Sequence, residues 1–414
     1  MPSPVAITDP PATPDEAGLP AGRVILKPRK AQPFLGRHPW VFASAVDRVE
    51  GEPRDGDVVD LLSDKERFIA RGVLNSRSKL RVRLYCWSGE PPLDVAFWRE
   101  RIEAAIALRR QLGLLTPQGG ARLVYSEADG LSGLVVDWFA GHLVVQLNSL
   151  AMAARWPMLA PMLIELLSPA SVTFRIDKTI AADEGLAPQH AVANGSPPEE
   201  GASVEEHGIA YAVDLLGGQK TGFYLDQREN RLAAARYMAA RRVLDLFCYT
   251  GGFALAAAKL GGAAEVIGVD SSKKAIAAAE ANAERNGMAN VRFSVGEGFQ
   301  AMESYQGLGR PFDAIVLDPP KFTRTRKGVP AALQAYHRLN RRAVELLTPG
   351  GILVTCSCSG GVMREDFLEM LSGVAQKSGR DIQILEQRGA APDHPVAATC
   401  LETEYLKCFI CRVG

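Results

Sequence analysis

The chain has 414 residues, 47% of them hydrophobic, which is enough for roughly two to four domains that each bury an apolar core. Lys plus Arg and Asp plus Glu both number 47, and this balance excludes a global basic field of the kind that marks many nucleic-acid binders. Seven cysteines without paired CxxC motifs indicate reduced thiols, and we expect no bound metal. Apolar runs fall short of the ~18 residues that span a bilayer, and the N-terminus lacks a signal-peptide pattern. We therefore expect a cytoplasmic protein without membrane contact.

The N-terminal part of the chain has two compositions. Residues 1–22 are rich in proline and poor in large apolar side chains, which predicts a disordered tail. Residues 23–90 contain short β-like runs separated by turn signals, which predict a small β-barrel. The runs are 24–26, 58–62, 68–70 and 80–85. Residues 23–83 hold 14 Lys and Arg against 8 Asp and Glu, so the neutral total hides a local basic excess.

Residues 91–204 have the pattern of a linker helix followed by an α+β middle domain. Apolar positions predict a helix over 92–112, closed by Gly113. The predicted strands are 123–126, 133–138, 142–148 and 172–176, with a helix from about residue 151 to 167. Residues 188–206 look like the loosest segment of this domain, and residues 209–216 alternate again as a strand.

Residues 205–414 alternate helices and strands, and the strands are nearly continuous runs of Val, Ile and Leu. This pattern predicts an α/β fold, a doubly wound parallel sheet with helices on both faces. The predicted strands are 242–246, 265–269, 291–295, 314–317 and 352–356, and the predicted helices are 230–240, 254–260, 273–286 and 331–347. Residues 382–386 and 405–411 are expected to add a pair of antiparallel edge strands.

A candidate ligand site follows the first two strands of this sheet. Gly251 stands at a strand-to-helix turn, where backbone can approach a ligand closely. Asp270 ends the second strand, 25 residues after Asp245, where a carboxylate can accept hydrogen bonds from ribose hydroxyls. The turn lacks the GxGxxG pattern that wraps a pyrophosphate, which favours a nucleoside without a diphosphate, such as S-adenosylmethionine (SAM). The alternative is a structural Gly turn in a domain without a ligand.

Acidic and thiol groups end the next two strands. Two prolines follow Asp318 and fix a rigid loop that directs this carboxylate toward the cleft, unless it is a turn or capping acid. Cys356 and Cys358 end the fifth strand, and a thiolate beside SAM and an acid is the set needed to alkylate a pyrimidine carbon. The pattern alone does not choose between the two thiols. We expect the remaining cysteines to be packing residues: Cys86, Cys248, Cys400, Cys408 and Cys411.

These motifs together resemble the RlmI-type bacterial large-subunit (23S) ribosomal RNA cytosine carbon-5 methyltransferases, over about residues 23–414. The matching segments are 37–42, 127–131, 205–209, 218–228, 247–253, 318–322, 357–360 and 393–395. The resemblance implies a PUA RNA-binding domain at 23–90, a middle domain at 91–204 and a class I (Rossmann-like) SAM-dependent methyltransferase domain at 205–414. It also implies that 5-methylcytosine forms through a covalent bond between a cysteine and cytosine carbon 6.

The resemblance also implies roles for individual residues. Cys358, rather than Cys356, stands at the nucleophile position, and Asp318 is the catalytic acid beside it. The expected SAM contacts are Gln227, Arg228, Asp245, Phe247, Tyr249, Thr250, Gly251, Asp270, Glu297 and Asp318. Glu297 departs from the family's pattern, which has Asp at this adenine contact, and Ala181 and Ala182 stand where basic residues are expected.

The substrate is expected to be a single-stranded or splayed cytosine in ribosomal RNA, because carbon 6 is not reachable inside a base stack. The expected RNA contacts are Lys27, Arg29, Arg37, Trp40 and Lys321. Trp40 and Phe42 offer stacking surfaces, although core packing explains Trp40 equally well, and the basic excess of the first domain can also be a solvated face. Lys321 is in addition a candidate to stabilise the thiolate. Monomer and homodimer both stay open.

Two other functions fit parts of the pattern. Methylation of an exocyclic amine needs no nucleophilic cysteine, but it uses an aromatic residue directly after the two prolines. Lys321 occupies that place, and Phe322 comes one residue later. A non-catalytic ribosome assembly factor that holds SAM structurally is the alternative from another class.

Overall fold

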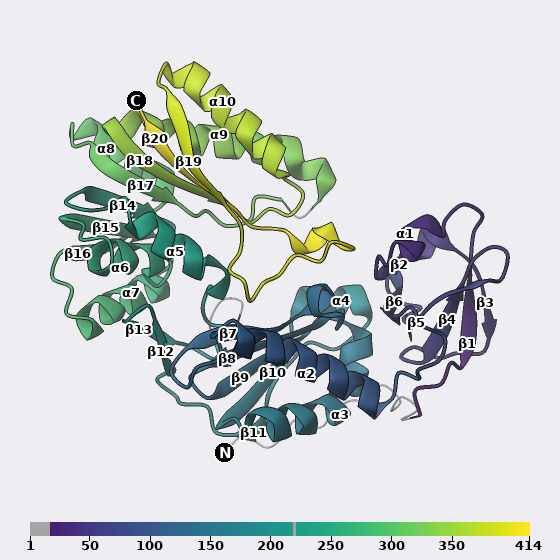
Figure 1. Cartoon of the computed structure of the whole chain (residues 1–414). Helices are drawn as coiled ribbons and strands as arrows, with labels where there is room; N and C mark the ends of the chain where they lie inside the picture. Colours follow the sequence, from purple (N-terminus) through teal and green to yellow (C-terminus); the bar gives the residue numbers. More distant parts are fainter. Residues whose placement is uncertain (1–16, 218–220, 324) are drawn as a thin grey trace. The chain divides into compact units, whose positions relative to one another are not determined.

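The computed structural model describes residues 17–217, 221–323 and 325–414 (Figure 1). Residues 1–16 of the predicted tail, and residues 218–220 of one matching segment, lie outside this described part. The chain forms two compact units. The first comprises Met1–Ala202, Val213–Phe223 and Asp393–Thr403, and the second comprises Ser203–Ala212, Tyr224–Pro392 and Glu404–Gly414. Each unit is therefore assembled from three separate stretches of sequence.

The N-terminal sheet of the first unit has the strand order β2-β6-β5-β4-β1-β3 among the described residues. The strands are β1 (Gly22–Leu26), β2 (Trp40–Phe42), β3 (Val46–Gly51), β4 (Val58–Leu62), β5 (Phe68–Leu74) and β6 (Leu80–Cys86), and a short helix α1 (Gln32–Leu35) follows β1. The four predicted runs are confirmed as β1, β4, β5 and β6. Strand β3 has no buried residue, so no apolar alternation marked it in the sequence.

The middle part of the first unit combines long helices with a sheet in the order β11-β10-β9-β8-β7. Its elements are α2 (Val95–Gln111), β7 (Gly120–Tyr125), β8 (Leu134–Phe139), β9 (His142–Leu147), α3 (Leu150–Leu167), β10 (Ser171–Ile176), α4 (Lys178–Glu184) and β11 (Gln189–Gly195). The predicted linker helix is confirmed as α2. It begins where the carboxylate of Asp94 accepts a hydrogen bond from Phe97 N at 2.9 Å, an N-cap.

Helix α3 differs from the expectation that no segment approaches a membrane span. It has 18 residues with a mean hydropathy of 1.3, so by length and composition alone it is long and apolar enough to cross a membrane. More than half of the helix is buried inside the unit, where Leu159 and Leu163 belong to the apolar core. The helix also carries the buried Arg155, which donates to Gly56 O and Ala151 O. These contacts explain its apolar composition as that of a core helix.

The prediction that residues 188–206 form a loose segment is wrong, because this range contains two strands. β11 pairs with β10 as an antiparallel edge strand. β12 (Ala202–Glu206) forms a two-stranded sheet with β13 (Ile209–Val213). Most side chains of β11 are exposed, so its sequence lacks the alternation of a half-buried strand.

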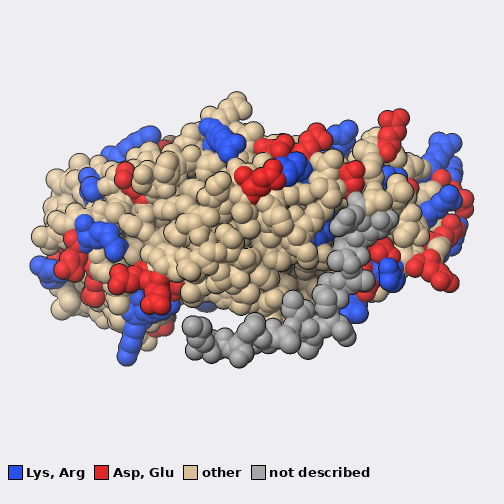
Figure 2. Space-filling model, turned by 90° about the horizontal axis from the view of Figure 1, so that it is seen from below, with Lys and Arg blue, Asp and Glu red and all other residues tan. Residues whose placement is uncertain are grey.

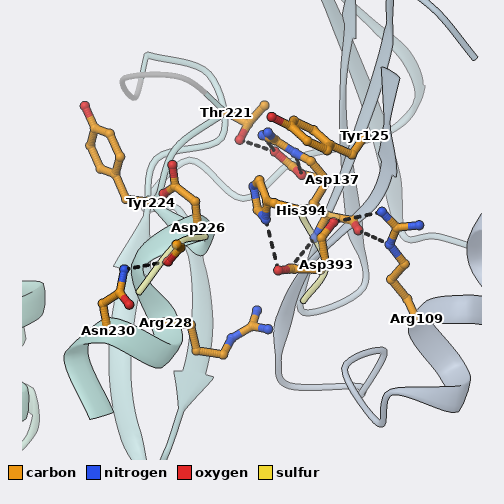
Figure 3. A network of polar contacts seen from close by, with 12 residues as sticks. Arg109, Tyr125, Asp137, Thr221, Tyr224, Asp226, Arg228, Asn230, Asp393 and His394 are labelled. Atoms are coloured by element: carbon orange, nitrogen blue, oxygen red, sulfur yellow. Dashed lines mark hydrogen bonds and ion pairs between the residues drawn. The ribbon is translucent and has the colours of Figure 1, made fainter. Parts of the chain in front are cut away.

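A buried ion pair stabilises the sheet of the middle part (Figure 3). The carboxylate of Asp137, which is fully buried, accepts two hydrogen bonds from the guanidinium of Arg122 at 2.8 and 2.7 Å. It also accepts a hydrogen bond from the Thr221 hydroxyl, so a distant part of the sequence is bonded to strand β8. Removal of one partner of such a pair leaves a buried charge without compensation.

We therefore expect Asp137→Ala to destabilise the protein by about 3–5 kcal/mol. The measurement is the midpoint of urea unfolding followed by circular dichroism. Glu165→Ala is the matched control, because Glu165 forms an exposed ion pair with Arg99 and its removal should leave the midpoint unchanged. Equal midpoints for both variants would contradict the stabilising role of the buried pair.

The second unit contains the doubly wound sheet, in the order β16-β15-β14-β17-β18-β20-β19. Its strands are β14 (Arg242–Leu246), β15 (Glu265–Asp270), β16 (Val291–Val295), β17 (Phe312–Leu317), β18 (Leu347–Ser357), β19 (Ile382–Arg388) and β20 (Lys407–Val413). Its helices are α5 (Arg228–Ala235), α6 (Gly252–Lys259), α7 (Lys273–Arg285), α8 (Gly298–Gly307), α9 (Val329–Leu346) and α10 (Arg364–Ser378). Figure 1 shows α5, α6 and α7 on one face of this sheet and α8, α9 and α10 on the other. The predicted fold class is confirmed.

The expectation of a terminal edge pair is only half right. β20 lies inside the sheet, antiparallel to β18 on one side and to β19 on the other, and only β19 is at the edge. Buried side chains along β20, such as Phe409 and Ile410, fit a strand with neighbours on both sides.

The register of the parallel strands places the candidate site residues along one edge. Leu246 pairs with Val269 in β15 and with Leu317 in β17, and Leu317 pairs with Thr355 in β18. The residues that follow these positions therefore leave the sheet at its carboxyl edge, where doubly wound folds bind ligands.

Figure 2 shows Lys and Arg side chains mixed with Asp and Glu side chains among the described residues of one face, with broad areas of other residues between them. This mixture agrees with the formal net charge of zero.

Candidate active site

The loop between β14 and α6 has an unusual backbone. Phe247 and Tyr249 have φ angles of 64° and 49°, in the left-handed region that aromatic residues rarely adopt, and Gly251 follows with φ 86°. Such a conformation costs about 1–3 kcal/mol for each non-glycine residue and persists only where the surroundings enforce it. The glycine was evident from the sequence, and the resemblance named Phe247 and Tyr249 as SAM contacts, but no pattern predicted the strained backbone of these two aromatic residues.

Asp270 fixes this loop from the end of β15. One oxygen of its carboxylate accepts a hydrogen bond from Tyr249 N at 3.0 Å, and the other accepts from Ser272 N at 2.9 Å. Thr250 is held from the opposite side, because its carbonyl accepts a hydrogen bond from the buried Asn282 amide at 3.2 Å. Asp270 is half-buried, and each carboxylate oxygen has a further lone pair that a ribose hydroxyl can use.

Asp245 is a fully buried carboxylate of the candidate site. One of its oxygens accepts a hydrogen bond from Ala254 N at 2.9 Å, and the other has no hydrogen-bond partner among the described residues. Burial, and then the neighbouring carboxylates of Asp318 and Asp270, raise the pKa of Asp245 well above its ordinary value, although the Ala254 N–H opposes the shift. A buried acceptor without a partner fits the positively charged groups of SAM, which would supply both a donor and a compensating charge.

Gly251 lies close to the ring of Phe293 and leaves no room for a side chain. A Cβ atom at this position would lie 2.9 Å from the ring of Phe293, and its φ angle strains any L side chain. We expect Gly251→Ala to weaken SAM binding at least about tenfold, about 1.4 kcal/mol, because the loop must shift to relieve the contact. Isothermal titration calorimetry with SAM measures the effect.

Gly262→Ala is the matched control for this loop variant. Gly262 also has a positive φ angle, +65°, but a Cβ atom there would meet nothing within 4 Å. Both variants therefore carry backbone strain, and only Gly251→Ala should change SAM affinity. Equal affinities in the two variants would overturn the assignment of the loop to SAM.

Asp318 and Cys358 follow neighbouring strands and lie close together. The sulfur of Cys358 is 3.9 Å from the carbonyl oxygen of Pro319, the residue after Asp318. Both side chains also act on Tyr224. Burial first, and then the charges of Asp318 and Asp226 and smaller contributions from Tyr249 and Cys358, raise the pKa of the Tyr224 phenol. The ring of Tyr224 contacts that of Tyr249 edge to face, with centroids 5.3 Å apart.

The two candidate thiols have different environments. Cys358 is partly exposed, whereas Cys356 is fully buried. Burial, and then contact with Cys408, raise the pKa of Cys356 well above its ordinary value, so its sulfur stays a thiol. The cysteines expected to be packing residues are buried, as anticipated: Cys86, Cys248, Cys400, Cys408 and Cys411.

Tyr336, a buried residue of α9, anchors the backbone on both sides of Cys358. Its hydroxyl is within hydrogen-bonding distance of the Ser357 hydroxyl at 2.9 Å and of the Ser359 hydroxyl at 3.1 Å. The Ser359 hydroxyl also accepts a hydrogen bond from Phe322 N at 3.2 Å, which connects the loop after Asp318 to the same position. Nothing in the sequence marked Tyr336 as a site residue, because a tyrosine on the apolar stripe of a helix looks like an ordinary core residue.

The segment before α5 contributes buried polar groups. The Gln227 side-chain oxygen accepts a hydrogen bond from the Asn230 amide at 2.6 Å (Figure 3). The Arg228 guanidinium is 3.8 Å from the Glu206 carboxylate. Asp226 accepts a hydrogen bond from the Tyr405 hydroxyl. Interaction with the Gln227 side chain lowers the pKa of the Cys356 thiol, against the larger raising effect of burial. Gln227 thus stands near the carboxyl end of β18, whereas Arg228 is paired within the protein.

Glu297 lies at the N-cap of α8, after β16. Its side chain is exposed and makes no capping hydrogen bond to the helix. The carboxylate therefore remains accessible to an external donor at the sheet edge where the adenine contact was expected.

The proposed RNA contacts belong to different units. Lys27, Arg29 and Arg37 are exposed in the first unit, and Lys321 is exposed in the second. Trp40 is only half-buried, but its indole N–H donates to the Glu127 carboxylate at 2.9 Å, which favours packing over stacking for this ring. Phe42, in contrast, has 47% of its surface exposed and offers a free ring face.

One cluster in the first unit has metal-ligand residue types. The ligand atoms of His38, Cys400 and Glu402 lie within 4.8 Å of one another. His38 Nδ1 accepts a hydrogen bond from Trp40 N at 3.3 Å, which leaves the proton of a neutral ring on Nε2, 3.4 Å from the Glu402 carboxylate. This arrangement is that of a hydrogen bond between His38 and Glu402, so we assign no metal to the cluster.

Comparison with known proteins agrees with this geometry. The family model of S-adenosylmethionine-dependent methyltransferases matches residues 125–404, and that of PUA-like domains matches residues 24–87. Two solved structures have the same fold over 94% of this chain and 99% of theirs. They are a SAM-dependent methyltransferase from Streptococcus mutans, with 21% identity and a TM-score of 0.80, and the methyltransferase SMU.776 complexed with SAH, with 22% identity and a TM-score of 0.81.

Curated relatives extend the similarity over nearly the whole chain. Ribosomal RNA large subunit methyltransferase I of Aeromonas hydrophila is 40% identical over 92% of this chain and 96% of its own length. The protein of the same name from Cronobacter sakazakii is 37% identical over 94% of this chain and 99% of its own length. The chain therefore belongs to the family of SAM-dependent methyltransferases whose members include ribosomal RNA large subunit methyltransferase I.

Proposed function

We propose that this protein methylates carbon 5 of a cytosine in large-subunit ribosomal RNA, with Cys358 as the nucleophile. The observation that carries the proposal is the partly exposed thiol at the carboxyl end of β18, 3.9 Å from the Pro319 carbonyl. It lies on the same sheet edge as Asp245 and Asp270, the candidate SAM contacts.

The chemistry requires a covalent intermediate on the protein. Carbon 5 of cytosine is too weakly nucleophilic to take a methyl group directly. The Cys358 thiolate therefore forms a bond to carbon 6, and the electron pair of the 5,6 double bond moves toward carbon 5, which becomes carbanionic. SAM, when bound, supplies an electrophilic methyl group on its sulfonium sulfur. Carbon 5 forms a bond to this methyl carbon as the methyl–sulfur bond breaks, and S-adenosylhomocysteine is the leaving group. Carbon 5 then loses its proton to a base, and the electrons of that C–H bond reform the ring double bond as the Cys358–carbon 6 bond breaks.

Two carboxylates have separate proposed roles. Asp318 donates a hydrogen bond to the N3 and carbonyl side of the cytosine, where negative charge develops during the addition. Asp270 holds the strained loop and accepts from ribose hydroxyls of SAM. The remaining proposed SAM contacts are Gln227, Arg228, Asp245, Phe247, Tyr249, Thr250, Gly251 and Glu297.

The proposed substrate also suggests where the protein acts. We propose a PUA domain at 23–90, a middle domain at 91–204 and a catalytic domain at 205–414, with a cytoplasmic location because the substrate is ribosomal RNA. Lys27, Arg29, Arg37 and Lys321 remain the proposed RNA contacts, and Phe42, with its exposed ring, takes the stacking role in place of Trp40, whose indole is bonded to Glu127.

The test is incubation of the purified protein with unmodified large-subunit ribosomal RNA and methyl-labelled SAM, followed by identification of the labelled nucleoside. Label in 5-methylcytosine supports the proposal, and label on an exocyclic nitrogen would replace it with amine methylation. No label on any ribosomal RNA fragment would favour a SAM-holding assembly factor. Bisulfite sequencing of ribosomal RNA from a strain without the gene then identifies the nucleotide.

A further inference from the structure

Lys407 is a buried cation beside the proposed nucleophile. It begins strand β20, and only 2% of its surface is exposed. Its amine donates to the carbonyl oxygen of Ser359 at 2.9 Å and to that of Tyr405 at 2.8 Å. An ammonium group has three hydrogens, so these two bonds leave one further donor. A buried amine is retained in a protein at a free-energy cost, which points to a partner that benefits from its charge.

The strand register brings this amine to the position of Cys358. Lys407 pairs with Ser357 across β18 and β20, and its amine bonds the carbonyl of Ser359. Cys358 is the residue between these two contacts. The effect of Cys358 on Lys407 agrees with this position. Burial lowers the pKa of the Lys407 amine to about 8, and among the charges that oppose this shift the Cys358 thiolate has the largest effect.

Other charged groups around Lys407 are largely balanced or exposed. Glu404 acts in the same direction as Cys358, whereas Arg364 and Lys321 lower the pKa of the amine further. Arg364 is paired with Glu404 at 2.8 Å, so these two charges offset each other. Lys321, which the sequence suggested for thiolate stabilisation, is exposed and therefore screened by water.

The carboxylates of the site make such a cation necessary. Asp318 lies near Cys358, and Asp245 and Asp270 lie along the same sheet edge. Negative charges disfavour the formation of a thiolate, and a free thiol is only a few per cent ionised at neutral pH. We propose that Lys407 is a positioning residue whose buried ammonium stabilises the Cys358 thiolate, an inference that rests on the proposed role of Cys358 as nucleophile.

The pH dependence follows from the two groups. Below pH of about 8 the amine is a cation and favours the thiolate, and the benefit fades as the amine loses its proton at higher pH. Replacement of Lys407 by a neutral residue should therefore slow the reactions of Cys358 most between pH 6 and 8. The difference should vanish at about pH 10, where the thiolate forms without help.

The test is alkylation of the full-length protein with iodoacetamide, in which the thiolate sulfur forms a bond to carbon and iodide leaves. Peptide mass spectrometry follows Cys358 from pH 6 to 10, without RNA or SAM. Lys407→Gln keeps hydrogen-bond donors but loses the charge, and Lys407→Arg keeps the charge. The measured quantity is the midpoint pH, at which the alkylation rate of Cys358 is half its maximum. We expect Lys407→Gln to raise this midpoint by at least about one pH unit, which makes alkylation about tenfold slower at pH 7. The midpoint of Lys407→Arg should stay near that of the wild type.

Internal controls separate this effect from unfolding. The other six cysteines are buried, so their alkylation stays slow while the fold is intact. If Lys407→Gln exposes these cysteines, the wild-type protein alone provides the test. The proposal requires that the midpoint pH for alkylation of wild-type Cys358 lies clearly below the pKa of a free thiol, about 8.5. A wild-type midpoint at or above that value, or equal midpoints in wild type and Lys407→Gln, overturns the inference.

The outcome also separates this inference from the proposed function. If Cys358→Ala abolishes RNA methylation while Lys407→Gln leaves the alkylation profile unchanged, the function stands and the role of Lys407 falls. If Lys407→Gln shifts the alkylation profile but Cys358→Ala still forms 5-methylcytosine, the interaction between Lys407 and Cys358 is supported. The assignment of Cys358 as the nucleophile is then wrong.

Discussion

Cys358→Ala is expected to reduce formation of 5-methylcytosine at least about 1,000-fold, because the covalent bond to carbon 6 has no substitute in the site. The measurement is transfer of labelled methyl groups to unmodified ribosomal RNA in single-turnover reactions. SAM affinity, measured separately by calorimetry, should be unchanged, because the Cys358 thiol is proposed to bond the cytosine and is not among the proposed SAM contacts.

Cys356→Ala is the matched control for the nucleophile. Cys356 lies two residues earlier on the same strand but is fully buried, so its removal should lower stability and leave the rate of methyl transfer nearly unchanged. A variant of Cys358 that still methylates carbon 5 at the normal rate, or loss of transfer in Cys356→Ala with an intact fold, would reverse the assignment of the two thiols.

Asp318→Asn is expected to lower kcat by about 100- to 10,000-fold, because an amide cannot take the proton-transfer or charge-assisted hydrogen-bonding role of the acid. Transfer rates at saturating SAM and RNA measure this effect, and calorimetry measures any change in SAM binding, which should be smaller than tenfold.

Asp313→Asn provides the comparison on the same strand. Asp313 lies near the opposite end of β17, where its carboxylate accepts hydrogen bonds from Arg242 N and the Thr348 hydroxyl. Its replacement should affect stability only. Similar losses of kcat in both variants would mean that the effect of Asp318 is structural.

The sequence predicted the doubly wound sheet and most of its edge residues because both depend on local patterns. Asp270 and Asp318 directly follow apolar runs, so the parallel register alone brings them to one edge. The choice between Cys356 and Cys358 needed the resemblance, and the structure adds a physical reason, since only one of these thiols is partly exposed.

Other features depend on tertiary contacts that no local pattern records. The left-handed backbone at Phe247 and Tyr249 opposes the intrinsic preference of aromatic residues and is imposed by Asp270 and the surrounding packing. Lys407 follows an apolar residue at the start of a strand, and a lysine there ordinarily reaches solvent. Its burial follows from the insertion of β20 between β18 and β19, which the sequence analysis placed at the edge.

The position of β20 also constrains the order in which the protein folds. β20 pairs on both sides with strands that precede it, and Gly351 and Ile382 both align with Val413. β19 therefore cannot join the sheet until the end of the chain has threaded into place beside β18, a non-local step of the kind that folds slowly. Since Lys407 arrives with the same strand, a nascent or partly folded chain would carry Cys358 without its cation. The enhanced reactivity of the thiol would then appear only when the last strand has closed the sheet.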